Sequence, residues 1–330
     1  MIRRRNFITL LGGAAAWPLA AQAQQPGRVR RVGMLIGTSE SDPEGARQYT
    51  TIQRELEKLG WTVGRNLQID ARWAAGDPER ARANAAELLR LAPDVVWVAT
   101  PAALAALQQA TRTVPIVFSV ISEPIVQGFV ASLARPGGNI TGFSNLEPTL
   151  GAKWLELLKE IAPNVRRVAV VFNAENSPFN VAFSHSAEAV AAIFHVDVAP
   201  TPVHELAEIE IIISRLAREP GGGLIFVPDF FLTSRRHLIV ELAARYQLPA
   251  VYPSRIFPDS GGLLSYGADR FDIDRRSAGY VDRILRGEKP ADLPVQQPVK
   301  FELVINMKTA KALGLTVPLT IQAISNEVIE

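Results

Sequence analysis

Short apolar runs alternate with amphipathic segments along almost the whole chain from residue 30 onward. Residues 95–98 and 168–172 are apolar at every position, which is typical of strands that a parallel sheet buries on both faces. Elsewhere, as in 44–59, apolar residues recur at spacings of three and four and predict helices. The pattern predicts strands at 31–38, 67–73, 94–99, 115–120, 139–143, 167–172, 196–203, 224–227, 249–252 and 262–266, and helices at 44–59, 78–91, 102–111, 127–134, 150–161, 179–194, 207–218, 234–246 and 272–286.

This alternation of strand and helix runs through one series and starts again near residue 146. Two consecutive βαβ series predict an α/β protein with two doubly wound parallel sheets, one in each of two lobes. A chain of 330 residues is also long for a single core and suits two domains. We place the main segment of the first lobe at 30–145 and begin the second at 146, because residues 145–149 resemble a linker.

The first residues have the features of an export signal rather than of a folded element. Three arginines at 3–5 precede an apolar stretch at 7–21, and Ala21-Gln22-Ala23 is a cleavage signal of the A-x-A kind. The stretch is shorter than the roughly 20 residues of a membrane-spanning helix. We therefore predict a signal peptide at 1–23, with a buried N-terminal helix as the alternative. The run Arg4-Arg5-Asn6-Phe7-Ile8 resembles a twin-arginine signal, and the general secretory route is the alternative.

Charge and cysteine content narrow the function classes. Cleavage after Ala23 removes three arginines, so the formal net charge changes from +2 to about −1, and no basic stripe typical of nucleic-acid binding is left. The cysteine count is zero, which excludes thiol catalysis, disulfides, Cys-ligated metals and a lipid anchor on cysteine. We expect an exported protein that is free in the periplasm, monomeric and without a nucleic-acid partner.

Candidate ligand contacts follow the predicted strands, because open α/β sheets bind ligands at the carboxyl ends of their strands. Thr100-Pro101 is the most informative pair, since Thr is a good N-cap and Pro is favoured at the first helical position. The N–H groups of Ala102 and Ala103 then predict a carboxylate or phosphate site, the alternative being a capped helix with water at its tip. Most residues at the strand ends are neutral polar or aromatic, which suits hydrogen bonding and stacking: Thr38, Ser39, Glu40, Thr100, Pro101, Ser119, Ser122, Glu123, Asn173, Asp229, Phe230, Phe231, Ser254 and Tyr266.

Sequence signatures of enzymes and metal sites are missing. The chain contains no G-x-S-x-G, no G-x-x-x-x-G-K-[ST] and no G-x-G-x-x-G after the first strand, and its four histidines lack metal-ligand spacing. Asp269, Asp272 and Asp274 resemble a calcium loop, but arginines are interleaved with them and the Gly and terminal Glu are missing. We interpret them as a solvated helix start, and we predict no catalytic residue, no metal and no cofactor.

Several segments are specific through their order and spacing, although none is diagnostic alone: Gly76-Asp77-Pro78, Thr100-Pro101-Ala102-Ala103, Pro115-Ile116-Val117-Phe118-Ser119, Pro136-Gly137-Gly138-Asn139-Ile140-Thr141-Gly142, Ser265-Tyr266-Gly267, Gly287-Glu288-Lys289-Pro290-Ala291-Asp292-Leu293-Pro294 and Leu303-Val304-Ile305-Asn306. Through them the chain resembles the ABC transporter substrate-binding family, whose characterised members include tryptophan- and tyrosine-binding proteins. The resemblance implies a type I periplasmic-binding-protein fold with a hinge and three crossings between lobes, which puts 269–289 on the first lobe and 290–330 on the second. It also implies permease and ATPase partners, and a small-molecule ligand whose carboxylate lies at residues 100–103.

One departure from the family concerns the residue that would face the α-amino group of an amino-acid ligand. Relatives typically read Val-Pro-Thr-Asp-Asn where this chain has Val227-Pro228-Asp229-Phe230-Phe231, so the acidic residue that would face an α-amino group is displaced by one position. Either Asp229 compensates or the ligand lacks that group. Glu123 also stands where relatives commonly have Asp. We expect a transporter component that binds a small carboxylate, either an amino acid or an aromatic or aliphatic acid; the alternatives are a periplasmic sensor subunit and an α/β enzyme.

Overall fold

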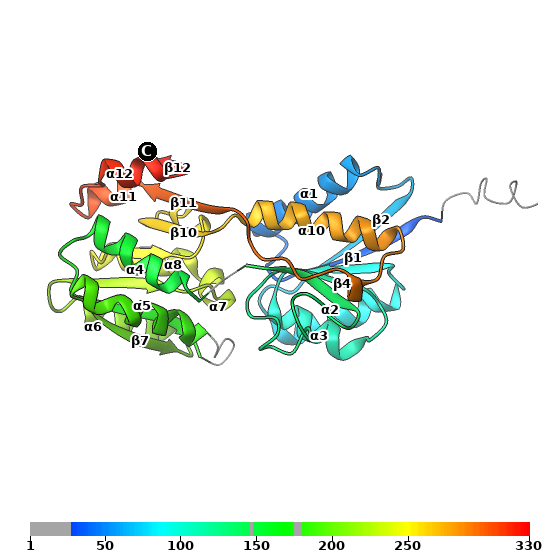
Figure 1. Ribbon diagram of the computed structural model, residues 1–330, viewed down its shortest axis with the longest axis horizontal. Helices are drawn as coiled ribbons and strands as arrows, with labels where there is room; N and C mark the ends of the chain where they lie inside the picture. Colours follow the sequence, from blue (N-terminus) through cyan, green and yellow to red (C-terminus); the bar gives the residue numbers. More distant parts are fainter. Residues whose placement is uncertain (1–27, 146–147, 175–179) are drawn as a thin grey trace, which may run out of the picture.

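The computed structural model describes residues 28–145, 148–174 and 180–330. The predicted signal peptide at 1–23 and its cleavage signal lie outside the described residues. Two lobes lie one after the other along the longest axis, each with its own sheet between helices (Figure 1). This arrangement confirms the predicted α/β class with two doubly wound lobes.

The first lobe is built on a five-stranded sheet in the order β2-β1-β3-β4-β5, in which every neighbouring pair is parallel. Residues along its central strands alternate between two cores: Met34 and Trp97 pack on the side of the first helix, Leu35 and Val98 on the opposite side. Its elements are β1 (Arg30–Ile36), α1 (Pro43–Lys58), β2 (Leu67–Trp73), α2 (Pro78–Arg90), β3 (Val95–Val98), α3 (Pro101–Ala110), β4 (Ile116–Ile121) and β5 (Ile140–Ser144).

The second lobe repeats this strand order as β7-β6-β8-β9-β10 and extends it by two strands. The first added strand, β11, pairs antiparallel with β10, and β12 pairs parallel with β11. The elements are α4 (Leu150–Ile161), β6 (Arg167–Asn173), α5 (Val181–Phe194), β7 (Asp197–Val203), α6 (Leu206–Leu216), β8 (Gly222–Phe226), α7 (Phe230–Ser234), α8 (Arg236–Arg245), β9 (Ala250–Tyr252), α9 (Ile256–Asp259), β10 (Leu264–Ala268), β11 (Phe301–Asn306), α11 (Met307–Ala312), α12 (Leu319–Ile324) and β12 (Glu327–Ile329).

The chain returns from the second lobe to the first after β10. Helix α10 (Arg270–Leu285) packs against α1 and β4 (Figure 1), and η2 (Pro290–Asp292) follows it on the first lobe. Leu293 is fully buried in a first-lobe core, and Gln296 bonds to β5 through Gly142 O (3.0 Å) and Ser144 N (2.8 Å). These contacts keep the chain on the first lobe as far as Gln296, whereas the expected boundary lies at residue 290.

Two local expectations differ from the structure. The predicted helix at 127–134 is wrong, and turns occupy that segment. Glu123 and Gly128 have positive φ angles of 44° and 71°, outside the α-helical region, and Pro124 follows the first of them. The helix predicted at 234–246 is preceded by the separate short helix α7, because the backbone leaves helical geometry at Arg235. Among the described residues, no helix combines the length and the apolarity needed to span a membrane.

Candidate functional site

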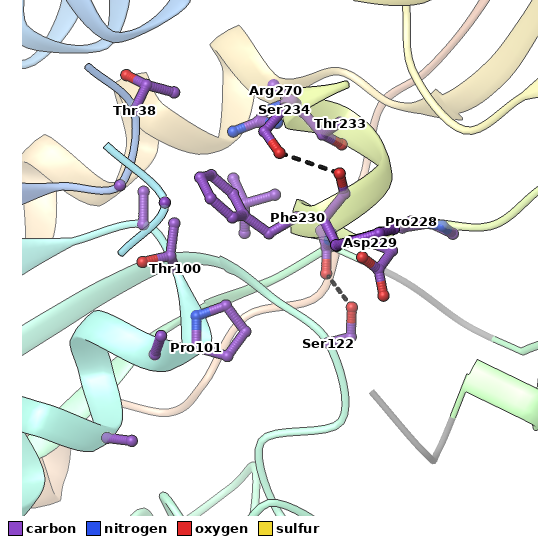
Figure 2. Close-up of a pocket in the computed structure, with 18 of the residues that line it drawn as sticks. Thr38, Thr100, Pro101, Ser122, Pro228, Asp229, Phe230, Thr233, Ser234 and Arg270 are labelled. Carbon is purple, nitrogen blue, oxygen red and sulfur yellow. Dashed lines mark hydrogen bonds between the residues drawn. The ribbon is translucent and has the colours of Figure 1, made fainter. Parts of the chain in front are cut away.

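A cleft of about 1230 Å³ lies between the two lobes. Its first wall is formed by the segments that follow β1 and β3, and its second wall by those that follow β8 and β9 (Figure 2). These are carboxyl ends of parallel strands, where doubly wound sheets bind ligands. The volume is above the roughly 300–1,000 Å³ of most small-molecule pockets, so a small solute would still leave room for water.

The start of α3 is the first feature of this cleft. Thr100 is extended (φ −139°, ψ 146°) and only 7% exposed, and Pro101 holds the first helical position. Contrary to the predicted capping role, the Thr100 hydroxyl makes no bond to the helix backbone. The first turn contains no acidic side chain, so the partial positive charge of the helix end is not neutralised locally. The hydroxyl and this helix end both belong to the cleft wall.

Glycine at position 37 makes the position of Thr100 possible. A Cβ at Gly37 would lie 2.1 Å from Thr100 Cγ2, so any side chain there would displace Thr100. The neighbouring Thr38 also lines the cleft, and its Oγ1 is buried without a hydrogen-bond partner among the described residues. β1 and β3 therefore bring two threonines to the first wall, and the Thr38 hydroxyl is turned inward against Gly45 of α1.

Asp229 and Phe230 form the opposite wall, on α7. The Asp229 side chain accepts a hydrogen bond from Leu232 N (3.2 Å) and thereby caps this helix. The Phe230 ring crosses toward the first lobe, where a Cβ at Gly76 would lie 3.2 Å from its Cε1. Figure 2 shows the ring directed toward Thr38 and Thr100, and the Asp229 carboxylate directed away from them.

Sequence reasoning did not select two charged residues of the cleft, Glu44 and Arg270. Glu44 lies in the first turn of α1 and is 8% exposed, and Arg270 begins α10. Arg270 Nε lies 3.7 Å from Glu44 Oε1 and, within the described chain, has no hydrogen-bond partner. The sequence does contain a signal for Arg270. This residue lies among the aspartates that directly follow β10, and so at the end of a strand.

The interpretation of those aspartates as a solvated helix start is wrong. Asp272 and Asp274 are 4% and 2% exposed, respectively. Asp272 forms ion pairs with Arg275, Arg276 and Lys300, and Asp269 caps the helix by accepting from Asp272 N (3.0 Å). The helix packs this face against the lobe, which removes the aspartates from water. No group of His, Asp or Glu residues within the described ranges has a geometry that would hold a metal ion.

The structure brings only part of the predicted set to the cleft. Thr38, Thr100, Pro101, Ala102, Asp229 and Phe230 line it, as do the strand-end residues Ser122, Phe231 and Ser254. Ser39, Ala103, Ser119, Glu123, Asn173 and Tyr266 do not. The cleft is lined mainly by residues that follow strands, whereas Ser119 and Tyr266 lie within β4 and β10 and Ala103 is buried in a core.

Two of the residues outside the cleft, Ser119 and Tyr266, have structural roles. Ser119 is fully buried and donates to Asp274 Oδ1 (2.5 Å), and burial raises the pKa of Asp274 to about 7 against the opposing charge of Arg270. Tyr266 stacks on Phe301 with ring centroids 5.9 Å apart, and its carbonyl accepts from Trp154 Nε1 (2.7 Å). Both residues hold elements together rather than contact the cleft.

Two sheets of the same strand order, joined by crossings and facing one cleft, define a two-lobed binding protein of the type I periplasmic fold. The model of the family "ABC transporter substrate binding protein" matches residues 40–329. The chain therefore belongs to the ABC transporter substrate-binding proteins, as the sequence motifs predicted.

Individual relatives agree with this assignment. The chain is 27% identical over 266 residues to a tyrosine-binding protein of Clostridioides difficile (strain R20291), a match that covers 79% of this chain and 75% of the relative. It is similar to an ABC domain from Streptococcus pneumoniae solved with L-Trp, with a TM-score of 0.82, 26% identity and coverage of 91% and 99%. A conserved domain protein from Vibrio cholerae has the same TM-score, 27% identity and coverage of 91% and 100%.

Proposed function

We propose that this protein captures a small carboxylate-bearing solute outside the cytoplasm and delivers it to the permease and ATPase of an ABC uptake transporter. The observation that carries the proposal is Thr100, a nearly buried hydroxyl that the helix behind it does not use and that lines the cleft. Beside it, the first turn of α3 offers backbone N–H groups and a positive helix end to an anion.

The remaining cleft surface suits the body of such a solute. Pro101, Val126 and Phe129 supply apolar surface from the first lobe, and Phe230 supplies it from the second. Gln108 and Gln127 also line the cleft; their Nε2 groups donate to the carbonyls of Gly128 (2.8 Å) and Ser122 (2.5 Å), which leaves their amide oxygens as acceptors for polar substituents. The two relatives of known ligand are named for tyrosine and L-Trp, which both carry a carboxylate and an aromatic body, and this supports a ligand of that general shape.

The proposal includes release of the solute without chemical change by a monomeric receptor. Two carboxylates line the cleft among the described residues. Asp229 caps its own helix, and Glu44 lies next to two guanidinium groups, so neither is placed as a general base. Recovery of the bound solute by mass spectrometry after long incubation tests this directly. A chemically altered product would make the protein an enzyme and would refute the receptor function.

We also propose export with removal of residues 1–23 along the twin-arginine route. The proposal is supported by the order of features in the leader, in which arginines are followed by an apolar stretch and then by an A-x-A cleavage signal. The mass of the periplasmic protein should correspond to a chain that starts at Gln24. Replacement of Arg4 and Arg5 by Lys should stop export, and unaffected export would assign the general secretory route instead.

Thr100→Val tests the carboxylate site. A thermal-shift screen of amino acids and of aromatic and aliphatic acids first identifies a binder, and calorimetry then measures its affinity. Loss of a hydrogen bond to a charged group should weaken binding by about 1.5–3 kcal/mol, because valine keeps the shape of threonine without its hydroxyl. Thr113→Val, in the exposed loop after α3, is the matched control and should leave binding unchanged. Unchanged affinity in Thr100→Val would place the carboxylate elsewhere.

A further inference from the structure

We infer that the solute carries no α-ammonium group, so that it is an acid with an apolar body rather than an amino acid. This inference rests on the proposed carboxylate site and concerns the group next to the carboxylate, on the α-carbon of the same ligand. An ammonium group that enters a closed cleft loses its hydration, and this loss must be compensated by a carboxylate or by several acceptors. The acidic residues among the described cleft-lining positions are Glu44 and Asp229.

Asp229 is committed to its own helix. Its side chain accepts from Leu232 N (3.2 Å) as the N-cap of α7, and the residue is 6% exposed. Figure 2 shows its carboxylate directed away from Thr100, where the proposed carboxylate end of the solute is held. Turning toward the solute would cost the helix its cap. Asp229 therefore does not compensate for the displaced acidic position of the sequence.

Glu44 is neutralised by two guanidinium groups. Its carboxylate lies 3.7 Å from Arg270 Nε and 3.9 Å from Arg47 Nη1, and the Glu44 residue is 8% exposed. Two positive charges next to one carboxylate leave no net negative potential for a third cation. An ammonium group would have to displace an arginine to reach this side chain.

Phe230 occupies the place on the second wall from which an acceptor would face the solute. Its ring reaches across the cleft to Gly76, and Figure 2 shows it beside Thr38 and Thr100. A phenyl ring has no hydrogen-bond acceptor of the strength an ammonium group requires, and its π face compensates only part of the lost hydration. The ring instead provides apolar contact near the α-carbon, which carries the amino group in an amino acid.

Arg270 favours a negatively charged group in the cleft. It lines the cleft, and its Nε is buried without a hydrogen-bond partner in the described part of the chain. The two guanidinium groups around Glu44 outnumber its single negative charge, and the Arg270 Nε–H has no hydrogen-bond acceptor among the described residues, so this region together with the positive end of α3 favours a solute of net negative charge over a neutral zwitterion. A simple carboxylate is such a solute at neutral pH.

Matched pairs of compounds test the inference on the mature full-length chain. The pairs are L-tyrosine with 3-(4-hydroxyphenyl)propionate, L-tryptophan with indole-3-propionate and L-leucine with 4-methylpentanoate, measured by calorimetry in the same buffer. In each pair that binds, we expect the acid without the amino group to bind about tenfold or more tightly, because it leaves no unpaired buried cation. Equal or tighter binding of the amino acid would overturn the inference and leave the proposed function intact.

The variant Phe230→Asp supplies the missing acceptor. It should shift the preference within a binding pair toward the amino acid by about tenfold or more. Ile211→Asp is the matched control, because Ile211 is 63% exposed on α6 of the same lobe and is not among the residues that line the cleft. A preference that stays unchanged in Phe230→Asp, or that shifts equally in both variants, would overturn the inference. Failure of every member of the three pairs to bind would refute the proposed function together with it.

Discussion

Asp274 is a buried carboxyl group that helps to attach α10 to the first sheet. It accepts from Ser119 Oγ on β4, and Ser277 Oγ, which donates to the Asp274 carbonyl (2.7 Å), accepts from Trp97 Nε1 on β3 (2.8 Å). These hydrogen bonds connect α10 to two neighbouring strands through side chains that are almost fully buried. The network explains why a polar strand-end residue such as Ser119 is needed without touching the cleft.

The raised pKa of Asp274 predicts a pH dependence of stability. Its pKa is about 7 in the folded protein and about 3.9 in an unfolded chain, so between these values only the folded state holds the proton. The contribution of Asp274 to the free energy of unfolding therefore falls as pH rises from about 4 to 7. Asp274→Asn cannot ionise, so its melting temperature relative to the wild type should increase between pH 5 and pH 8.

The control for this measurement is Glu160→Gln, which changes an exposed carboxyl of α4. Glu302 is a second carboxyl whose pKa burial raises to about 7, but it is present in both proteins and cancels from the comparison. A constant difference between Asp274→Asn and the wild type across the pH range would contradict the prediction.

Helices α4 and α5 show how one residue determines the distance between two elements. A Cβ at Gly151 in α4 would lie 1.9 Å from the carbonyl oxygen of Phe183 in α5. The absence of a side chain lets the two backbones approach, and Trp154 then packs on the Phe183 ring with centroids 5.3 Å apart. This contact belongs to the core of the second lobe.

Alanine substitutions in two helices should have opposite effects on stability. Gly151→Ala should destabilise the protein by about 1–3 kcal/mol, because backbone of α5 must move. Gly279→Ala in α10 should stabilise it by about 0.5–1 kcal/mol, because a Cβ there meets nothing within 4 Å and alanine favours the helix. Urea unfolding midpoints measure both. Destabilisation of equal size in the two variants would show that close packing of α4 on α5 is not the cause.

At the scale of the whole molecule, the two lobes touch across the cleft through an ion pair as well as through Phe230. Arg236 at the start of α8 lies 3.3 Å from Asp42, the N-cap of α1, and their side chains are 12% and 17% exposed. This ion pair connects the first lobe to the second, so it exists only while the two lobes are close. A ligand that contacts both walls drives closure by binding the closed form more tightly than the open form.

Asp42→Asn should weaken closure while each lobe stays folded. Asparagine caps helices as well as aspartate does, so the bond from Glu44 N (2.9 Å) is retained and only the charge is lost. A solute identified by the screen should bind about two- to fivefold more weakly, because the attraction between the charges is lost while the asparagine oxygen can still accept a hydrogen bond from Arg236. Small-angle scattering should show the radius of gyration of the wild type decreasing with that solute, and decreasing less in the variant.

The double variant with Arg236→Gln provides the internal check. Both single variants break the same pair, so their effects on affinity should not add in the double variant. Additive effects would mean that Asp42 and Arg236 act independently. A radius of gyration that does not change at saturating solute in the wild type would argue against the hinge motion itself.

The sequence by itself was enough to determine the family, the α/β class and the presence of two doubly wound lobes. Strand and helix periodicities are local properties, and they located most of the elements up to residue 286. The start of α3 was also readable, because Thr100 and Pro101 follow a fully apolar strand. The predicted helix at 127–134 failed because the apolar spacing does not report backbone angles, and the backbone has positive φ at Glu123 and Gly128.

Tertiary structure alone decided which strand-end residues face the cleft. Ser119 and Ser122 are three positions apart, yet one is buried against α10 and the other lines the cleft. Arg270 reaches the cleft only because α10 returns to the first lobe, a long-range packing that no local pattern encodes. The role of Asp229 likewise depends on where α7 begins, since the bond that its carboxylate accepts from Leu232 N sets the direction of the side chain. The hydrophobic periodicity reports burial along one element, whereas a binding site is formed by residues from several elements.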